Sequence, residues 1–255
     1  MRISTKTIGI VAAAIAIAAF SMGAANAAFT AYNDCSMTSS GNVTSYQAKS
    51  DTQQTPATTG LLVNYATGIP TVVTCNATAS GVLVCWTDPV VNVPYATGTD
   101  AANIFNGKLD FTGSPELNDD TQWYQYDFSG LNANATYVFA ATMNRNNSGY
   151  TTRITKYTLS GAAAWVNQSS TGTTKSADGL STTFCVGYNT VNGYVAKWSI
   201  TGSSAFSVRA IRNPGTKSYG FGELMLEEVP EPGSLLALGT GLMGLMGMAL
   251  RRRTR

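Results

Sequence analysis

The segment from Leu235 to Leu250 constrains the chain most, because it has no charged residue and is followed by clustered arginines. At about 1.5 Å rise per residue it would form about 24 Å of helix, near the lower limit for crossing a bilayer. Arginine side chains next to such a helix can extend to the headgroups, and they favour the cytoplasmic side. These residues are Arg251, Arg252, Arg253 and Arg255. We therefore expect a transmembrane helix over 235–250 and a basic membrane stop over 251–255.

A short proline motif precedes the predicted helix. Pro230 and Pro232 lack an amide N–H, and each favours extended geometry in the residue before it. Ser234 is a suitable N-cap for the helix that follows. Protease grooves commonly bind an extended segment through its backbone, so this arrangement favours a processed sorting tail over a plain membrane anchor.

Residues 229–255 resemble the PEP-CTERM sorting signal, whose signature here is Pro230-Glu231-Pro232. Proteins with this signal are substrates of exosortase, a membrane-embedded enzyme of bacteria that make exopolysaccharide. The resemblance implies recognition at the proline motif, cleavage near it, and delivery to the cell envelope or matrix. As with other C-terminal signals whose apolar tail is removed, the mature protein would have no span.

Residues 1–27 have the pattern of a secretory signal peptide. Basic residues precede an apolar core over 8–20, and Ala25 and Ala27 form a small-residue cleavage site. We expect Ala28 to be the mature N-terminus. An uncleaved N-terminal anchor is the alternative, which the short apolar core disfavours.

The formal net charge of +2 does not describe the body of the chain. Six of the 16 basic residues lie in the two terminal segments, whereas all 14 acidic residues lie between Asp34 and Glu231. Residues 28–231 therefore carry 10 basic and 14 acidic residues, a net charge of −4. This balance leaves no basic patch for nucleic acid, so we expect no nucleic-acid binding.

The body shows the pattern of a secreted β-protein. Short apolar or alternating segments recur between turn residues, and no helical period is evident outside the terminal segments. Tyr124, Tyr126 and Phe128 share one face of a predicted strand, as do Tyr137 and Phe139 on the next. The predicted strands cover residues 71–75, 82–86, 122–128, 136–143, 152–159, 182–188, 194–200, 206–211 and 219–227.

We predict an all-β fold, an antiparallel jelly-roll-like β-sandwich over 61–228, flanked by the signal peptide and the transmembrane helix. Residues 28–60 form a polar N-terminal segment ahead of the predicted sandwich, and within it the Thr-, Ser- and Gln-rich stretch 36–60 is expected to be loose. The body also resembles β-sandwich domains of other exosortase substrates, which are similar in outline to galactose-binding-like jelly rolls. The segments that carry this resemblance are Gly130–Thr142, Asn144-Arg145, Gly149-Tyr150, Lys156-Tyr157 and Gly193–Trp198. The resemblance implies a fold and leaves function open.

The four cysteines all lie in the exported part and allow three pairings. An oxidising compartment favours disulfides, and a metal site is disfavoured because the chain has no histidine and no C-x-x-C spacing. We favour a Cys75–Cys85 disulfide, because the intervening Ala-Ser-Gly can turn a hairpin. Cys35–Cys185 would then join the N-terminal segment to the core.

The absence of histidine also removes Ser-His-Asp, Cys-His and histidine-based zinc catalysis. A carboxylate pair of the glycosidase type is the remaining catalytic possibility. The candidate carboxylates are Glu116, Asp119, Asp120, Asp127 and Glu223. Asp119 and Asp120 lie in a stretch typical of a solvated turn. We expect a protein that is not an enzyme and that has no cofactor and no catalytic metal.

Binding sites remain open in the sequence. Tryptophans could stack on sugar rings, although aromatic side chains more often belong to the core. These tryptophans are Trp86, Trp123, Trp165 and Trp198. Loop carboxylates such as Asp100 and Asp110 could hold a structural Ca²⁺.

The leading hypothesis is an exported, non-enzymatic surface or extracellular-matrix protein. It would be anchored transiently in the inner membrane through 235–250 and processed by an exosortase. The alternative is a carbohydrate-binding module that binds extracellular polysaccharide in the matrix.

Overall fold

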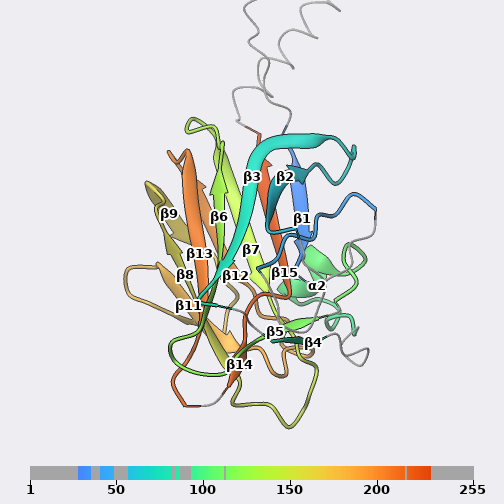
Figure 1. Cartoon of the computed structure of the whole chain (residues 1–255), viewed down its shortest axis with the longest axis vertical. Coiled ribbons are helices and arrows are strands. Elements are labelled where there is room, and N and C mark those ends of the chain that lie inside the picture. Colours follow the sequence, from blue (N-terminus) through green and yellow to red (C-terminus); the bar gives the residue numbers. More distant parts are fainter. Residues whose placement is uncertain are drawn as a thin grey trace, which may run out of the picture. The chain divides into compact units, whose positions relative to one another are not determined.

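The computed structural model describes residues 28–35, 41–48, 57–81, 84–86, 93–111, 113–215 and 217–230, without the side chains of Cys85, Trp86 and Ser114. Residues 29–229 form one compact unit of antiparallel sheets, with a single short helix among the described residues (Figure 1). Both the predicted signal peptide over 1–27 and the predicted span over 235–250 fall outside the described ranges. Within those ranges no helix has the length and apolar character needed to cross a bilayer.

Two large sheets form a β-sandwich. The five-stranded sheet has the order β1 (Thr30–Asp34), β15 (Glu223–Val229), β7 (Thr136–Thr142), β12 (Ala196–Thr201), β9 (Ala164–Asn167). The seven-stranded sheet has the order β10 (Thr174–Lys175), β11 (Ser181–Cys185), β8 (Ile154–Ser160), β13 (Ala205–Arg212), β6 (Trp123–Ser129), β3 (Pro70–Ala79), β2 (Thr59–Val63). A small third sheet has the order β14 (Ser218–Tyr219), β5 (Ser114–Leu117), β4 (Cys85–Trp86).

Alternation along the strands fills the space between the two large sheets. On β6, Tyr124, Tyr126 and Phe128 are buried while the residues between them are partly exposed, as the sequence predicted. On β7, Tyr137 and Phe139 are buried on the face toward the seven-stranded sheet, also as predicted. The hydrophobic core is therefore made by the inward faces of both sheets.

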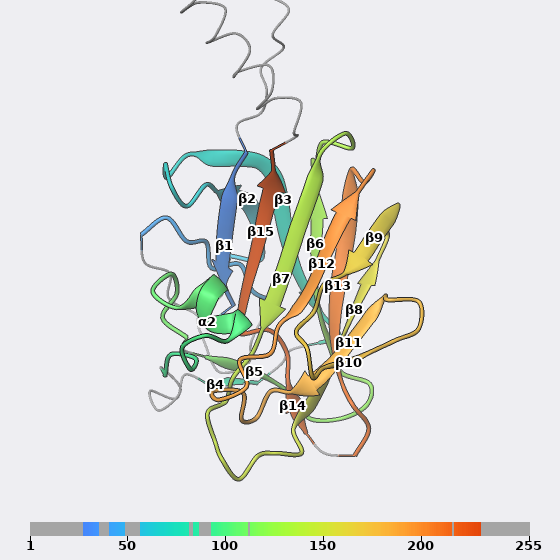
Figure 2. The ribbon, with the colours of Figure 1, turned by 180° about the vertical axis from the view of Figure 1, so that it is seen from behind.

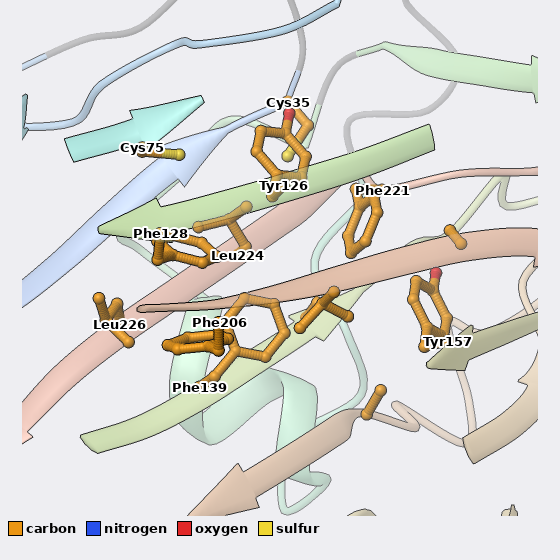
Figure 3. Packing of buried hydrophobic residues seen from close by; sticks show 14 of the residues in the cluster. Cys35, Cys75, Tyr126, Phe128, Phe139, Tyr157, Phe206, Phe221, Leu224 and Leu226 are labelled. Atoms are coloured by element: carbon orange, nitrogen blue, oxygen red, sulfur yellow. The ribbon is translucent and has the colours of Figure 1, made fainter. Parts of the chain in front are cut away.

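Phe139 packs in this core against aromatic side chains of both sheets (Figure 3). Its ring centroid is 5.6 Å from that of Phe128 and 5.9 Å from that of Phe206, both on the opposite sheet, with edge-on geometry. Trp198, on the neighbouring strand β12, lies 6.3 Å away by the same measure. Edge-to-face aromatic pairs add about 0.5–1.5 kcal/mol each beyond the area that they bury. This aromatic cluster therefore joins the two sheets.

A second, smaller core covers the other face of the five-stranded sheet. Helix α2 (Asp100–Phe105) lies over β1 and β15 (Figure 2). Its Ala101 and Phe105 belong to one buried cluster with Tyr32 of β1 and Met225 of β15. Thr99 caps the helix, because its hydroxyl accepts a hydrogen bond from the amide of Ala102. A six-residue helix is too short to show a period in sequence, and for this reason the sequence did not predict it.

The sandwich includes residues ahead of the predicted boundary at 61. β1 pairs with β15 over its whole length, and the side chain of Asn33 is fully buried. Its Oδ1 accepts hydrogen bonds from the amide of Tyr46 (2.7 Å) and the hydroxyl of Thr44 (2.9 Å). These hydrogen bonds join the described residues 44–46 of the polar N-terminal segment to the sheet.

The all-β prediction is confirmed by the antiparallel sheets. Strands correspond to most of the predicted segments, although their ends differ by a few residues. No predicted strand corresponds to β1, β2, β5, β9 or β10, and the segment 219–227 includes only one residue of β14. Apart from β1 and β2, which have five residues each, these strands have only two to four residues, and such short segments carry little periodicity.

Candidate functional site

β15 carries the chain into the predicted sorting motif. It is an interior strand, paired with β1 on one side and with β7 on the other. Leu224 and Leu226 are fully buried toward the main core, and Met225 is buried on the opposite face. An interior strand with both faces covered is held by two ladders of hydrogen bonds and by packing on each side.

The strand ends where the motif begins. Val229 still pairs with Thr136, and the next residue, Pro230, is exposed and outside the ladder. Proline cannot donate a backbone hydrogen bond, so a strand in the middle of a sheet stops at such a residue. The folded body and the motif are therefore adjacent in the chain, with no spacer between them.

The start of the body lies beside its end. The amide of Glu228 donates to the carbonyl oxygen of Phe29 at 2.8 Å, and Thr30 pairs with Glu227. Phe29, the second residue after the predicted signal-peptide cut, and Glu228, two residues before the predicted sorting motif, are thus direct neighbours.

Most sorting residues named by the sequence lie outside the described ranges. These are Ala25, Ala27, Glu231, Pro232, Arg251, Arg252, Arg253 and Arg255. Their roles in cleavage and in stopping the chain at the membrane stay predictions. Of the motif, the structure describes Pro230 alone.

At the start of β15 lies a buried carboxylate. Glu223 is 3 % exposed, and its Oε2 accepts a hydrogen bond of 3.0 Å from the hydroxyl of Tyr95. Burial is the main cause that raises its pKa well above the ordinary value of 4.5, and the nearby carboxylates of Asp34 and Asp110 add to it. This environment strongly favours the protonated form of Glu223.

The other candidate carboxylates are distributed over separate parts of the fold. Glu116 accepts hydrogen bonds from Lys217, whose Nζ lies 2.9 Å from Oε1. Asp120 pairs with Arg212 at 2.6 Å, and Asp119 accepts from Thr121 in the same exposed turn. Each carboxylate is bound by its own partner.

Metal binding has no structural support within the described ranges. No group of three or more histidine, cysteine, aspartate or glutamate side chains there could hold a metal ion. Asp100 lies in the first turn of α2, and Asp110 follows that helix. The Ca²⁺ site suggested for these two residues stays a prediction.

The predicted disulfide pairs are not formed, because Cys35, Cys75 and Cys185 are free thiols. Cys75 points into the core from β3, whereas Cys85 belongs to β4 in the third sheet and its side chain is outside the description. Cys35 is buried near Tyr126 (Figure 3), whereas the thiol of Cys185 donates to the carbonyl oxygen of Tyr150. The pairing was inferred from sequence spacing, and the sheets place these residues on different elements.

Burial raises the pKa of the Cys75 thiol and raises that of Cys35 well above its ordinary value. Thiols of this kind are inert, because the reactive thiolate is disfavoured. Their role in the described structure is to fill the core.

The tryptophans occupy different environments. Trp198 is fully buried and donates from Nε1 to the carbonyl oxygen of Gly179, so it belongs to the core. Trp165 is partly exposed and donates to the carbonyl oxygen of Asp178. Trp123 lies on the outward face of β6, where the guanidinium of Arg209 is 4.4 Å from its ring centroid. The side chain of Trp86 is outside the description.

A row of polar side chains from β6 and β13 lies next to Trp123 on the outward face of the seven-stranded sheet. Asp127 accepts from the hydroxyl of Ser207 and the amide of Gln125, both at 2.6 Å. Gln125 accepts in turn from Arg209 at 2.7 Å. The sequence named Asp127 as a possible acid but gave no sign of this network, because its members come from two strands 80 residues apart.

Comparison with known proteins finds a match for the C-terminal segment of the chain. The family model of the PEP-CTERM protein-sorting motif matches residues 228–253, which confirms the resemblance of the tail. The match begins at Glu228, so its first two residues are still part of β15. No curated protein and no solved structure matches the chain.

The buried carboxyl of Glu223 predicts a pH dependence of stability. A carboxyl whose pKa is raised by folding holds its proton in the folded state at pH values where the unfolded chain has released it. Its contribution to the free energy of unfolding is therefore complete below about pH 4.5 and falls as the pH rises through the folded-state pKa. We expect Glu223→Gln to raise the melting temperature at neutral pH and to leave it nearly unchanged at about pH 4.

Thermal unfolding followed by circular dichroism across this range measures the effect. Glu227→Gln is the matched control, because Glu227 lies on the same strand and is partly exposed. Equal shifts for the two variants at neutral pH would contradict the assignment of a buried, protonated Glu223.

Proposed function

We propose that this chain is an exported, non-enzymatic surface or extracellular-matrix protein that an exosortase processes at Pro230-Glu231-Pro232. The observation that carries the proposal is the sorting motif matched over 228–253, directly after the last strand of a folded β-sandwich. Residues 1–27 would direct export, and residues 235–250 would hold the chain in the inner membrane until it is cut. The body would then remain in the envelope or the exopolysaccharide matrix.

The position of the motif supports processing after folding. Val229 is paired in the sheet, so Pro230 is the first residue available in extended form to an enzyme groove. A cut on the C-terminal side of Val229 would leave all seven residues of β15 in place. The sandwich would therefore remain intact after the tail is removed.

A non-enzymatic role is supported by the environment of the acidic side chains. A carboxylate glycosidase needs two carboxyl groups roughly 5–10 Å apart that face one cleft. The described candidates Glu116, Asp120 and Asp127 are instead held by hydrogen bonds or ion pairs within the body, on separate elements. Structural pairing of this kind suits a stable extracellular scaffold.

A jelly-roll-like topology for the sandwich is part of the same proposal, and the strand order supports it. The run β6, β7, β8, β9, β11, β12, β13 alternates between the two large sheets. Its first and last strands, β6 and β13, are paired, as are β7 and β12. This pattern is expected for two nested Greek keys.

Carbohydrate binding is a second candidate function, favoured by the outward row on the seven-stranded sheet. It combines the Trp123 ring with the hydrogen-bonding groups of Gln125, Asp127 and Arg209. Sugars combine apolar ring faces with hydroxyl groups, so such a row suits them. Arg209 covers the tryptophan ring, and a sugar would have to displace it or bind beside it.

Affinity electrophoresis in gels that contain the exopolysaccharide of the native matrix tests this second candidate. We expect the protein to be retarded and Trp123→Ala to lose most of that retardation. Val166→Ala, at a position 61 % exposed on the other sheet, is the control. Parent migration that is the same with and without polysaccharide would rule the binding function out.

The sorting function predicts the fate of a proline variant. Replacing both Pro230 and Pro232 by alanine should remove the recognition motif and cause the uncleaved chain, with its arginine end, to accumulate in the membrane fraction. We expect the released form to fall to a tenth of the parent level or less. Immunoblots of membrane and extracellular fractions measure the ratio.

Pro214→Ala, in an exposed turn of the body, is the matched control for the loss of a proline. It should be processed like the parent. Unchanged release of the double variant would count against processing at this motif.

A further inference from the structure

Both ends of the body leave the sandwich at one end, here called the exit end. The exit end consists of Phe29, Val229 and four turns: 64–69, 130–135, 161–163 and 202–204. The amide of Tyr65 donates to the carbonyl oxygen of Thr30 at 2.8 Å, which places the first turn beside the start of β1. Thr136 pairs with both Val229 and Thr201, which places two further turns there. Figures 1 and 2 show the β2–β3 and β6–β7 turns at the end where β15 stops.

The turns of the exit end contain no charged residue. They consist of small, polar and apolar residues such as Gly, Ala, Ser, Thr and Asn. The opposite end of the sandwich has the ion pairs Arg212–Asp120 and Lys217–Glu116 and the exposed carboxylate of Asp119. Charge is therefore distributed unequally between the two ends.

Exposed apolar side chains gather on the β2–β3 hairpin that leads to this end. Of the five large hydrophobic side chains exposed within the described ranges, three lie there: Leu61, Ile69 and Val72, exposed by 44, 63 and 62 %. Lys108 is close to the same hairpin, with its ammonium 5.0 Å from the ring of Tyr65. An exposed apolar group beside a cation and a tyrosine is the composition of a membrane-interface contact.

The length of the chain after β15 limits how far this end can be from a bilayer. Five residues, 230–234, lie between Val229 and Leu235, where the predicted span begins, and the six Cα–Cα steps cover at most about 20–22 Å when fully extended. The headgroup layer occupies roughly 5–7 Å of that distance on each side of the hydrocarbon. As long as the tail is inserted, the exit end must therefore stay close to the headgroups.

We propose that the β2–β3 hairpin contacts the lipid headgroup layer while the tail is inserted, with Ile69 and Val72 as the contacting side chains. The inference rests on the anchoring step of the proposed function. Three exposed side chains give a weak contact on their own, and the tether keeps them at high effective concentration. Removal of the tail ends the tether, so the contact is lost and the sandwich leaves the membrane.

Photo-crosslinking of the full chain tests this contact. Ile69 is replaced by p-benzoylphenylalanine, and the chain is inserted into vesicles of phosphatidylethanolamine and phosphatidylglycerol. Val191 provides the control position, because it is 59 % exposed and lies in a turn at the opposite end. We expect a lipid adduct at position 69, detected by mass spectrometry, in at least fivefold higher yield than at position 191.

The outcomes separate this inference from the anchoring that it assumes. Flotation of the chain with the vesicles, compared with that of a chain that ends at Val229, reports tail insertion separately from any insertion of residues 1–27. A floating chain with equal yields at both positions overturns the hairpin contact and leaves the sorting proposal intact. A chain that fails to float contradicts insertion of the tail, and both proposals fall. In exporting cells, position 69 could instead form an adduct with a membrane protein. That result would show that the hairpin contacts a protein, and it would overturn the proposed contact with lipid headgroups.

Discussion

Strand β15 completes the five-stranded sheet by pairing with β1 on one side and with β7 on the other. The last strand of the body inserts between its first strand and a central one, and its residues pack on both faces of the sheet. The five-stranded sheet is therefore incomplete until residues 223–229 have been added. Contacts between such distant segments form late and slowly, because a long loop must close first. The strand that completes the sheet directly precedes the sorting motif in the chain, so the fold can be completed only when the chain has been made nearly as far as the motif.

The same pairing places both processing sites at one end of the body. Phe29 and Glu228 share a backbone hydrogen bond, so the signal-peptide cut and the sorting cut would flank neighbouring strands. β15 is held along its length by backbone hydrogen bonds to β1 and to β7. A force that pulls on its C-terminal end along the strand would act on both sets of hydrogen bonds at once. A body built in this way can stay folded while its tail is held in a membrane. It can also stay folded after release, because the strand ends at Val229, before the proline motif begins.

Most of the fold prediction rests on the alternation of apolar and polar residues along the strands. Tyr124, Tyr126 and Phe128 were assigned to one face and are buried there, because a strand that covers a core must alternate. Features that depend on tertiary contacts were not visible. Asn33 looks like a loop residue in sequence, yet its side chain holds residues 44–46 against β1. The cysteines looked like disulfide partners by spacing, and Trp198 looked like a possible sugar platform until its strand placed it in the core. The tail was recognisable because its signal is linear, whereas the outward network of Asp127 joins strands that only the fold brings together.

We propose that a folded β-sandwich is released from a membrane tail at the end of β15. The intact mass of the protein recovered from the cell surface or matrix distinguishes release from permanent anchoring. Release gives a chain that begins at Ala28 and ends between Val229 and Gly233, with any additional mass due to a group attached at the new C-terminus. A mass that still includes Arg251 to Arg255 would contradict it and would make the chain an ordinary single-span membrane protein.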